Sequence, residues 1–495
     1  MQIQRKMTDL LEGLDYTTAK GDDATITGLA FRSDKVTHGD LFFCIPGFKS
    51  DGHAYAPDAV SRGCAALVVK RKLDLEVPQF IVEDPRKYMG IISSRFYGDP
   101  SEQMDVVGVT GTNGKTTTTY LVDCVARHMG KKTGIIGTIG AKISDKVLPG
   151  DRTTPESPDL QSLFAEMVEA GCSEVAMEVS SHAIELHRVM GTRFSVVAFS
   201  NLTQDHLDFH KTMEGYFSAK AALFDKVYSD KAAICIDGEY GQRLSEMAVE
   251  NGLDVITCGF NEDAYVHVRD VEYLTTHTKL ALTVGDEDVE FDYALIGRFN
   301  VENIMVATSI CLALGYPLDV ICEAFSEAAA APGRLDRVIS DEASELGISV
   351  YVDYAHTPDS IIKAIAALRP ICEGRIIIVF GCGGDRDALK RPLMGAAACK
   401  ADYAIVINDN PRTEKPSAII TQILPGMQDS KERYEVIEDR RSAIRRAIEL
   451  AEPKDAVLIA GKGHETYQII GTETFPFDDK QVAAEEIAKV AKQGE

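Results

Sequence analysis

The sequence has no apolar run of the roughly 18 residues that a membrane-spanning helix needs. Its first residues, MQIQRKMTDLLEGL, also contain no apolar segment typical of a secretory signal. Basic residues are scarce, because 52 lysines and arginines stand against 76 acidic residues, for a formal net charge of −24. This balance argues against a general surface for nucleic acid or anionic membranes. We therefore expect a cytoplasmic protein in which the cations that bind an anionic substrate are gathered locally.

Paired cysteine motifs are missing as well. The eleven cysteines are odd in number and form no C-x-x-C pattern, and most sit in apolar or helical contexts. This usage favours reduced, buried thiols over disulfides or a zinc site. The sequence also lacks internal repeats and low-complexity tracts. A chain of 495 residues with 45% hydrophobic residues is expected to form two to four ordinary domains.

What the sequence does contain is a phosphate-binding pattern. An apolar segment at 106–109 predicts a buried strand, 116–129 predicts a helix, and a glycine-rich turn joins them. Backbone N–H groups in such a turn point at phosphate oxygens. Lys115 would reach the β- and γ-phosphates, and the Thr116 hydroxyl would ligate Mg²⁺. The pattern predicts a nucleoside triphosphate site made by Gly111, Thr112, Asn113, Gly114, Lys115, Thr116 and Thr117.

One glycine of this pattern is displaced. The strict motif has glycine where Val109 stands, and here the glycine comes one place earlier, at Gly108. A glycine-rich turn between a strand and a helix can also be purely structural. The strand, the Gly-Lys-Thr triplet and the helix agree with one another, which favours the nucleotide site.

Composition shifts divide the chain into three units. Residues 1–103 carry strand-like pieces at 40–45, 65–70 and 79–82, and a boundary falls in the stretch GDPSEQMD. Residues 104–332 begin with the phosphate-binding strand and contain further strands at 174–177 and 195–199 and a strand-rich stretch at 263–292. A Pro-Gly pair in AAAAPGRLDRV marks the second boundary, and residues 333–495 form the third unit.

The third unit alternates strands with helices. Short β-rich runs at 348–352, 375–380, 403–407 and 456–459 are each followed by a polar loop, respectively DYAHTPD, GCGGDRDALKRP, NDNPRTEKP and GKGHE. This alternation predicts a doubly wound parallel sheet, whose ligands lie beyond the carboxyl ends of the strands. The fold class expected for the whole chain is α/β, with a central P-loop domain and a C-terminal Rossmann-like domain.

Potential metal ligands follow two strands of the central unit. Glu178 closes the strand at 174–177, where P-loop proteins place a second Mg²⁺ contact, although it could also simply cap the strand. The segment SNLTQDHLDFH follows the next strand and contains Asp205, His206, Asp208 and His210. Histidine would suggest zinc, but cysteine ligands are missing, and Thr116 with Glu178 supplies the hard oxygens that Mg²⁺ prefers.

A lysine in an apolar helical context lies nearby. Lys220 in YFSAKAALF could snorkel to solvent or pair with an acid, as buried lysines usually do. An ammonium group is no metal ligand. Lysine becomes one only when it is covalently modified to carry a carboxylate.

Taken together, these segments resemble the Mur ligases, most closely the MurE type. The resemblance runs nearly the full length and is carried, in family order, by GVTGTNGKTTT, RTTP, MEVSSHAIELHRV, NLTQDHLDFH with AKAALF, IGRFNVEN, APGRLDRV, DYAHTPD, GCGGDRDALKRPLM, DNPRTEKP and GKGHETYQ with FDDK. It implies an ATP-dependent amide ligase of peptidoglycan synthesis. Such an enzyme phosphorylates the γ-carboxylate of UDP-N-acetylmuramoyl-L-alanyl-D-glutamate, and the amine of a diamino acid then attacks the acyl phosphate. We expect the chain to act as a monomer.

The resemblance assigns roles to individual residues. It implies ATP contacts from Lys115, Thr116, Asn300, Asn303, Arg334, Asp353 and His356, and a second metal site at Glu178, His206 and a carbamylated Lys220 (N6-carboxylysine). The UDP-sugar-peptide would be bound by Ser33, Thr153, Thr154, Ser180 and Arg188. The family commonly has Asp-Ser-Arg around the serine, whereas this chain has Arg32-Ser33-Asp34, which exchanges the two flanking charges.

The loops of the third unit are expected to select the amino acid. The motif Asp409-Asn410-Pro411-Arg412 looks like the version associated with meso-diaminopimelate, whose distal carboxylate lysine lacks. Arg412 and Arg386 could bind carboxylates through paired, charge-assisted hydrogen bonds, with Gly461 and Glu465 taking the other polar groups. Alternatively, Arg412 is a surface arginine that precedes Glu414.

Three other functions compete with this interpretation. Folylpolyglutamate synthetase, a ligase of the same superfamily, shares the P-loop and lysine region but is disfavoured by DNPR and GKGHE. A P-loop switch or motor would leave Lys220, His206 and the polar loops without a role. A non-catalytic binding module is disfavoured because no expected catalytic position is substituted.

Overall fold

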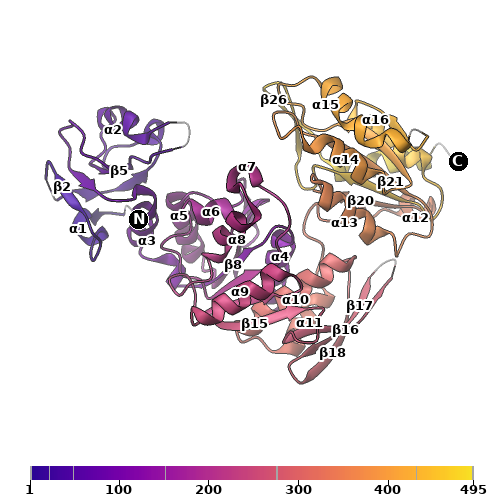
Figure 1. Cartoon of the computed structure of the whole chain (residues 1–495), viewed down its shortest axis with the longest axis horizontal. Helices are drawn as coiled ribbons and strands as arrows, with labels where there is room; N and C mark the ends of the chain where they lie inside the picture. Colours follow the sequence, from indigo (N-terminus) through magenta and orange to yellow (C-terminus); the bar gives the residue numbers. More distant parts are fainter. Residues whose placement is uncertain are drawn as a thin grey trace. The chain divides into compact units, whose positions relative to one another are not determined.

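The computed structural model describes residues 3–21, 23–47, 50–150, 152–274, 277–430 and 432–492, without the side chains of residues 208, 429 and 430. The chain forms two compact units: Met1–His267 with Met305–Ile321, and Val268–Ile304 with Cys322–Glu495 (Figure 1). In the described part of the chain, no helix is both long and apolar enough to cross a membrane. The eleven cysteines are free thiols.

The first sheet of the chain has the strand order β2-β7-β6-β5-β4. Its strands are β2 (Thr17–Ala19), β4 (Gly28–Ala30), β5 (Asp40–Phe43), β6 (Ala66–Val69) and β7 (Gln79–Ile81). Strands β4 to β7 are parallel and β2 is antiparallel to β7. The three strands predicted at 40–45, 65–70 and 79–82 are confirmed as β5, β6 and β7.

Alternating side chains cover both faces of this sheet. Leu41 and Phe43 pack with α1 (Met7–Leu10) and α3 (Pro85–Tyr97), whereas Phe42 packs with α2 (Ala56–Ser61) on the other face. The period of two in a strand produces this division. In Figure 1, α2 and α3 accordingly lie on opposite sides of β5. Helix α3 begins at Pro85 because Asp84 accepts hydrogen bonds from the Arg86 and Lys87 N–H groups.

The central sheet contains the phosphate-binding strand β8 (Asp105–Thr110) between β12 and β13. Around it lie β11 (Lys146–Leu148), β10 (Gly140–Ile143), β9 (Thr133–Gly137), β12 (Glu174–Glu178), β13 (Val196–Phe199), β14 (Lys231–Cys235), β15 (Asp254–Gly259) and β16 (Val266–Tyr273). The strands from β9 to β16 are parallel, apart from β10 and β11, which pair antiparallel. The strands predicted at 106–109, 174–177 and 195–199 are confirmed.

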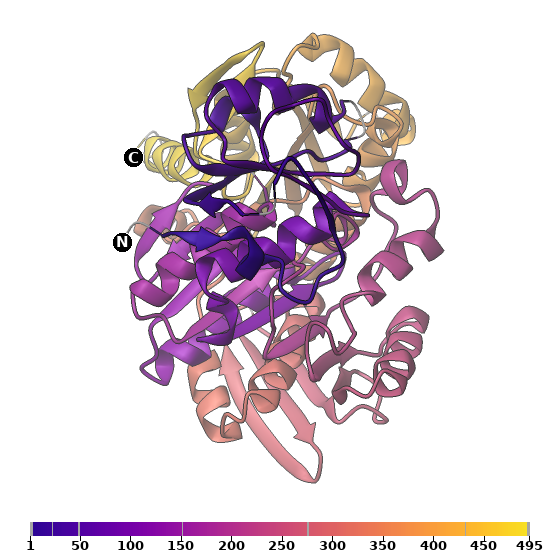
Figure 2. The same ribbon diagram turned by 90° about the vertical axis from the view of Figure 1, so that its left-hand side faces the viewer.

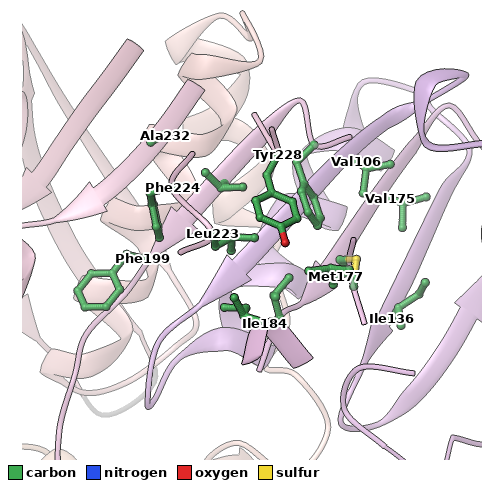
Figure 3. Packing of buried hydrophobic residues seen from close by; sticks show 14 of the residues in the cluster. Val106, Ile136, Val175, Met177, Ile184, Phe199, Leu223, Phe224, Tyr228 and Ala232 are labelled. Carbon is green, nitrogen blue, oxygen red and sulfur yellow. The ribbon is translucent and has the colours of Figure 1, made fainter. Parts of the chain in front are cut away.

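A buried apolar cluster holds this sheet and its helices together. Val106, Val175 and Met177 from the strands pack with Phe224 and Tyr228, which follow the helix α8 (Met213–Ala221) (Figure 3). The remaining helices of this region are α4 (Lys115–His128), α5 (Ser157–Glu169), α6 (Ser181–Glu185), α7 (Leu207–His210) and α9 (Glu239–Glu250). The loops that carry the predicted site residues of this region begin at the carboxyl ends of its parallel strands.

The second unit contains an antiparallel hairpin, β17 (Thr278–Val284) and β18 (Glu287–Tyr293), seen as two long salmon strands in Figure 2. With β16, these strands confirm the strand-rich stretch predicted at 263–292. Helix α10 (Arg298–Ala313) follows the hairpin.

The C-terminal sheet has the order β19-β20-β24-β21-β22-β23. Its strands are β19 (Asp336–Arg337), β20 (Ser349–Asp353), β21 (Ile376–Cys382), β22 (Tyr403–Asn408), β23 (Tyr434–Val436) and β24 (Ala456–Ala460). All pairs are parallel except β19–β20. The four strands predicted for this unit are confirmed as β20, β21, β22 and β24.

Helices cover both faces of the C-terminal sheet. Ile376 and Ile378 pack with α13 (Pro358–Leu368), α14 (Lys390–Ala398) and α15 (Pro416–Ile423), whereas Ile377 packs with α16 (Arg440–Leu450) and α17 (Asp479–Ala491). This is the doubly wound arrangement that the alternation of strands and helices predicts, and it confirms the expected α/β fold class. A small hairpin, β25 (Tyr467–Ile470) and β26 (Glu473–Pro476), follows β24.

Candidate functional site

The predicted phosphate loop lies between β8 and α4. Gly111 and Gly114 adopt positive φ angles of 149° and 89°, which only glycine adopts at no steric cost. A Cβ on Gly111 would lie 2.0 Å from the Ser200 Oγ atom. Helix α4 begins at Lys115, one residue before the predicted start, so its first N–H groups and dipole face the loop. The loop has the geometry of an anion cradle.

The segment after β13 supports this loop through several hydrogen bonds. Asn201 accepts from Thr112 N through its carbonyl (2.9 Å) and from Asn113 N through Oδ1 (3.0 Å). Thr203 N donates to Thr112 Oγ1 (3.0 Å), and Ser200 Oγ donates to Asn113 O (2.6 Å). Residues separated by about 90 positions in the sequence therefore fix the loop's conformation.

Two lysines converge on the same backbone carbonyl. Lys115 Nζ donates to Gly111 O and Thr112 O at 2.9 Å each, and Lys220 Nζ donates to Gly111 O at 2.8 Å. Lys220 lies in α8 and is only 1% exposed. Burial, and then the charge of Lys115, lowers the pKa of Lys220 well below its ordinary value. Lys220 is therefore a buried amine with a strong tendency to lose its proton, rather than a lysine that snorkels to solvent.

Glu178 ends β12 directly beside α4. Its carboxylate accepts hydrogen bonds from Thr116 Oγ1 (2.9 Å), Thr138 N (2.9 Å) and Thr138 Oγ1 (3.0 Å). Glu178 and Thr116 are 2% and 4% exposed. A hydroxyl and a carboxylate in contact are a donor set that suits Mg²⁺, which takes hard oxygen ligands.

The histidine-rich segment does not gather into a metal cluster. Within the described residues, no group of three or more His, Cys, Asp or Glu side chains could hold a metal ion. His206 lies 3.4 Å from Asp205 Oδ2, and its ring is edge-on to His182, while His210 Nε2 contacts Ser181 Oγ at 2.9 Å. The side chain of Asp208 lies outside the part that the structure describes. Of the four ligands expected in this segment, the described side chains of Asp205, His206 and His210 do not converge on one point.

The residues expected to bind the sugar-peptide form a chain of contacts from Glu178. Thr154 Oγ1 donates to Glu178 O (2.9 Å) and accepts from Ser180 N (3.1 Å), and Arg188 Nη1 donates to Thr154 O (3.2 Å). Thr153 Oγ1 lies 3.2 Å from Thr138 Oγ1. The structure therefore brings Thr153, Thr154, Ser180 and Arg188 close to Glu178 at the end of β12.

Sequence reasoning missed Glu156, which lies under these residues. This 4%-exposed carboxylate pairs with Arg188 Nε (3.0 Å), Arg86 Nη1 (3.0 Å) and Arg152 Nη1. Arg86 belongs to α3, 70 residues earlier in the chain. The TTPE sequence carried the glutamate, but nothing in it indicated three arginine partners.

Ser33 begins a short 3₁₀ helix in the N-terminal domain. Hydrogen bonds from Ser33 and Arg62 hold the pKa of Asp58 below its ordinary value. The neighbours that depart from the family pattern, Arg32 and Asp34, pair with each other at 2.7 Å. Although the two flanking charges are exchanged relative to the family pattern, they form an ion pair with each other.

In the second unit, Asn300 and Asn303 lie buried in α10. Asn303 Nδ2 donates to Asn300 Oδ1 (3.1 Å), and Asn300 Nδ2 donates to Ile296 O (2.8 Å). The two amides therefore hold each other's orientation at the start of the helix.

Asp353 ends β20 and accepts from Leu335 N (2.7 Å) and Ala355 N (2.8 Å), and burial raises its pKa. The guanidinium of Arg334 lies 4.9 Å from the centre of the Tyr354 ring. His356 Nδ1 lies 2.8 Å from the Tyr354 carbonyl. Arg334, Asp353 and His356 therefore share one edge of the C-terminal sheet, as predicted for a ligand site there.

The loops after β21, β22 and β24 meet at that edge. Asn410 Nδ2 donates to Glu465 Oε2 (3.0 Å), and a Cβ on Gly461 would lie 2.8 Å from Asp409 Oδ2. A Cβ on Gly383 would lie 2.9 Å from Arg412 Nη1 and 3.8 Å from Arg386 Cγ. The structure thus gathers the residues expected to bind the amino acid: Arg386, Asp409, Asn410, Pro411, Arg412, Gly461 and Glu465.

Arg412, expected alternatively as a surface arginine that precedes Glu414, is half-buried and makes no ion pair with that glutamate. Glu414 pairs with Arg391 instead, at 2.9 and 2.7 Å, and this contact lowers the pKa of Glu414 to about 2. Arg412 Nη1 donates to Gly384 O at 2.9 Å, and no carboxylate of the described residues pairs with Arg412 or Arg386. In a chain with a net charge of −24, Arg412 and Arg386 thus lie beside one loop with no acid partner among the described residues.

Fold and site together define a P-loop α/β protein with a second, Rossmann-like nucleotide-fold domain. Family models match three successive stretches: the Mur ligase family catalytic domain at 25–105, the Mur ligase middle domain at 109–311, and the Mur ligase glutamate ligase domain at 333–463. The chain belongs to the Mur ligase family.

Full-length relatives support this membership. The chain is 43% identical over 493 residues to a UDP-N-acetylmuramoyl-L-alanyl-D-glutamate–2,6-diaminopimelate ligase of Geobacillus thermodenitrificans, covering 97% of this chain and 98% of the relative. It is 43% identical over 489 residues to the protein of the same name from Clostridioides difficile, covering 98% and 100%.

Solved structures agree. The structure of a ligase with that same name matches with a TM-score of 0.70 and 31% identity over 94% of this chain and 95% of the other. Folylpolyglutamate synthase from Mycobacterium tuberculosis matches with a TM-score of 0.61 at 19% identity, covering 76% and 92%. At that identity the second match shows a shared fold only.

Proposed function

We propose that this chain is an ATP-dependent ligase that joins meso-diaminopimelate to UDP-N-acetylmuramoyl-L-alanyl-D-glutamate, a step in peptidoglycan precursor synthesis. The observation that carries the proposal is its 43% identity, over nearly its whole length, to a ligase named for this reaction. The phosphate loop accounts for ATP. Arg412 and Arg386, which pair with no carboxylate of the described residues, account for an amino acid with a distal carboxylate.

The reaction needs activation, because a carboxylate is a poor electrophile. Transfer of the γ-phosphoryl group to a γ-carboxylate oxygen of D-glutamate forms an acyl phosphate and releases ADP. The amine of diaminopimelate then attacks the carbonyl carbon, the C–O bond to phosphate breaks, and the amine loses a proton. Lys115 and the loop N–H groups would bind the phosphates, and Asn300, Asn303, Arg334, Asp353 and His356 would provide the remaining ATP contacts.

Thr116 and Glu178 would hold Mg²⁺, which neutralises charge on the phosphates. We assign a second ion to Glu178, His206 and Lys220, with Lys220 carrying a carbamate. The buried position and lowered pKa of Lys220 support this modification, since a neutral amine can attack CO₂, forming an N–C bond and releasing a proton. The product carries a carboxylate, whose oxygen atoms can bind a metal ion, whereas an ammonium group cannot.

Each domain has its own part in the proposal. Residues 1–103, including Ser33, would bind the UDP moiety, 104–332 would bind ATP and the dipeptide through Thr153, Thr154, Ser180 and Arg188, and 333–495 would bind diaminopimelate. The enzyme would act as a monomer in the cytoplasm and serve cell-wall synthesis, and through it cell shape and division.

Phosphate release from ATP tests the proposal. The purified chain is incubated with UDP-N-acetylmuramoyl-L-alanyl-D-glutamate and either meso-diaminopimelate or lysine, and mass spectrometry identifies the product. We expect release and an amide product only with meso-diaminopimelate. Release at background with both amino acids overturns the ligase, whereas a preference for lysine overturns only the role given to Arg412.

A further inference from the structure

Lys462 lies in the GKGHE loop after β24 and is completely buried, with an exposed fraction of 0%. Its neighbours Gly461 and Glu465 were expected to touch the amino acid, but nothing in the sequence singled out the lysine between two glycines. Its ammonium group donates to Asn410 Oδ1 at 2.9 Å and to Tyr467 O at 2.5 Å. A buried cation that contacts the DNPR motif needs a reason to be there, because desolvation of its charge is costly.

The contact fixes which way the Asn410 amide points. Asn410 Oδ1 accepts from Lys462 Nζ and from Ile469 N, both at 2.9 Å. Both groups can only donate hydrogen bonds, so the oxygen of the amide must face them. The amide nitrogen is thereby directed to Glu465 Oε2 at 3.0 Å. A flipped amide would set its N–H groups against these two donors. Lys462 thus determines the hydrogen-bonding character of Asn410.

The same ammonium group balances two acids of the site. Lys462 Nζ lies 3.5 Å from Glu465 Oε2 and 3.8 Å from Asp409 Oδ1, an oxygen that accepts no hydrogen bond from the described residues. Arg440, buried nearby, is paired with Asp479 at 2.6 Å. Lys462 therefore offsets part of the negative charge of Asp409 and Glu465 at the loop, and the charge of Arg440 acts on the same two acids.

We propose that Lys462 is a positioning residue for the amino-acid substrate: it orients Asn410 and holds Glu465 in place without touching the substrate itself. This inference rests on the proposed function, because it takes Asn410 and Glu465 as the groups that bind diaminopimelate. Lys462 then acts on the affinity for the amino acid and not on ATP. A lysine with only a structural role would change stability without this selectivity.

The test compares Lys462→Met with the wild-type chain, whose own activity first tests the ligase assignment. We expect the KM for meso-diaminopimelate to rise about tenfold or more, the loss that follows from removing a charged hydrogen-bond donor. The KM values for ATP and the UDP-dipeptide stay within about twofold. Lys462→Gln keeps a donor for Asn410 without the charge, so its KM for diaminopimelate lies between those of wild type and Lys462→Met.

Two further variants separate positioning from folding. Arg375→Met removes the cation that pairs with buried Asp455 at 2.8 Å, at the opposite end of β24, and should lower the melting temperature without changing the KM for diaminopimelate. In an Asn410→Ala background, Lys462→Met should add less than about threefold to that KM. An unchanged KM in Lys462→Met, equal rises for all three substrates, or full additivity with Asn410→Ala overturns the proposal. If Lys462→Met does not fold, Lys462→Gln and its combination with Asn410→Ala decide by the same criteria.

Discussion

Arg412 offers a sharp test of substrate selection because its backbone and its side chain can be perturbed separately. Its φ angle of 51° lies in the left-handed region, where a residue with a Cβ is strained by roughly 1–2 kcal/mol. The strain is held by Arg412 N donating to Ile469 O (3.3 Å) and by Gly471 N donating to Arg412 O (2.8 Å). Backbone strain of this kind is typical of functional sites.

Replacing Arg412 by alanine or by glycine removes the same guanidinium. Two charge-assisted hydrogen bonds to a carboxylate contribute about 3 kcal/mol, so the KM for meso-diaminopimelate should rise about 100-fold in both variants. The KM for ATP should stay nearly constant, because the lost contact is to a remote carboxylate. The variants differ in stability, since glycine relieves the left-handed strain that alanine keeps, by about 1 kcal/mol.

Steady-state kinetics with each substrate varied in turn, together with urea unfolding of both variants, measures these effects. If the lost guanidinium contact is the cause, Arg412→Ala and Arg412→Gly have the same KM for meso-diaminopimelate although their unfolding free energies differ. A KM that follows stability, or equal rises for all three substrates, refutes the reasoning. In both variants, the kcat/KM for lysine should rise relative to that for diaminopimelate, because lysine has no distal carboxylate and so makes no contact that the substitution removes.

Three further predictions concern the phosphate loop and the acid dependence of stability. Lys220→Ala should lower kcat by about 100-fold, and added formate or acetate should restore part of this activity. Lys115→Ala should show no such recovery. Recovery of both variants, or of neither, contradicts a carbamate on Lys220. Glu178→Gln should lower kcat by about 100-fold with little change in the KM for the UDP-dipeptide, and a change within about threefold contradicts its role as a magnesium ligand. Glu414 has a pKa lowered to about 2 in the folded chain against 4.5 ordinarily, so its contribution to stability is complete above about pH 4.5 and is lost as the pH falls toward 2. The difference in unfolding free energy between wild type and Glu414→Gln should therefore shrink as the pH falls over that window. A difference independent of pH refutes the lowered pKa of Glu414.

The local chemistry of this chain could be predicted from its sequence. The phosphate loop, the strands and the polar loops that follow them are set by periodicity, glycine placement and the strand–loop–helix order, all of which act over a few residues. Because parallel strands end at one edge of a sheet, the sequence also predicted that DNPR and GKGHE would lie together. The displaced Gly108 did not alter the loop, since the positive φ angles fall at Gly111 and Gly114.

Only the tertiary structure decided which partners each charged group has. Nothing local indicates that Glu156 pairs with three arginines, that Glu414 pairs with Arg391 rather than with Arg412, or that Lys462 is buried against Asn410. These contacts join residues from 4 to 70 positions apart, and their distances depend on how the helices and strands pack. The sequence determined what chemistry the loops can perform, and packing decided which side chains are free to perform it.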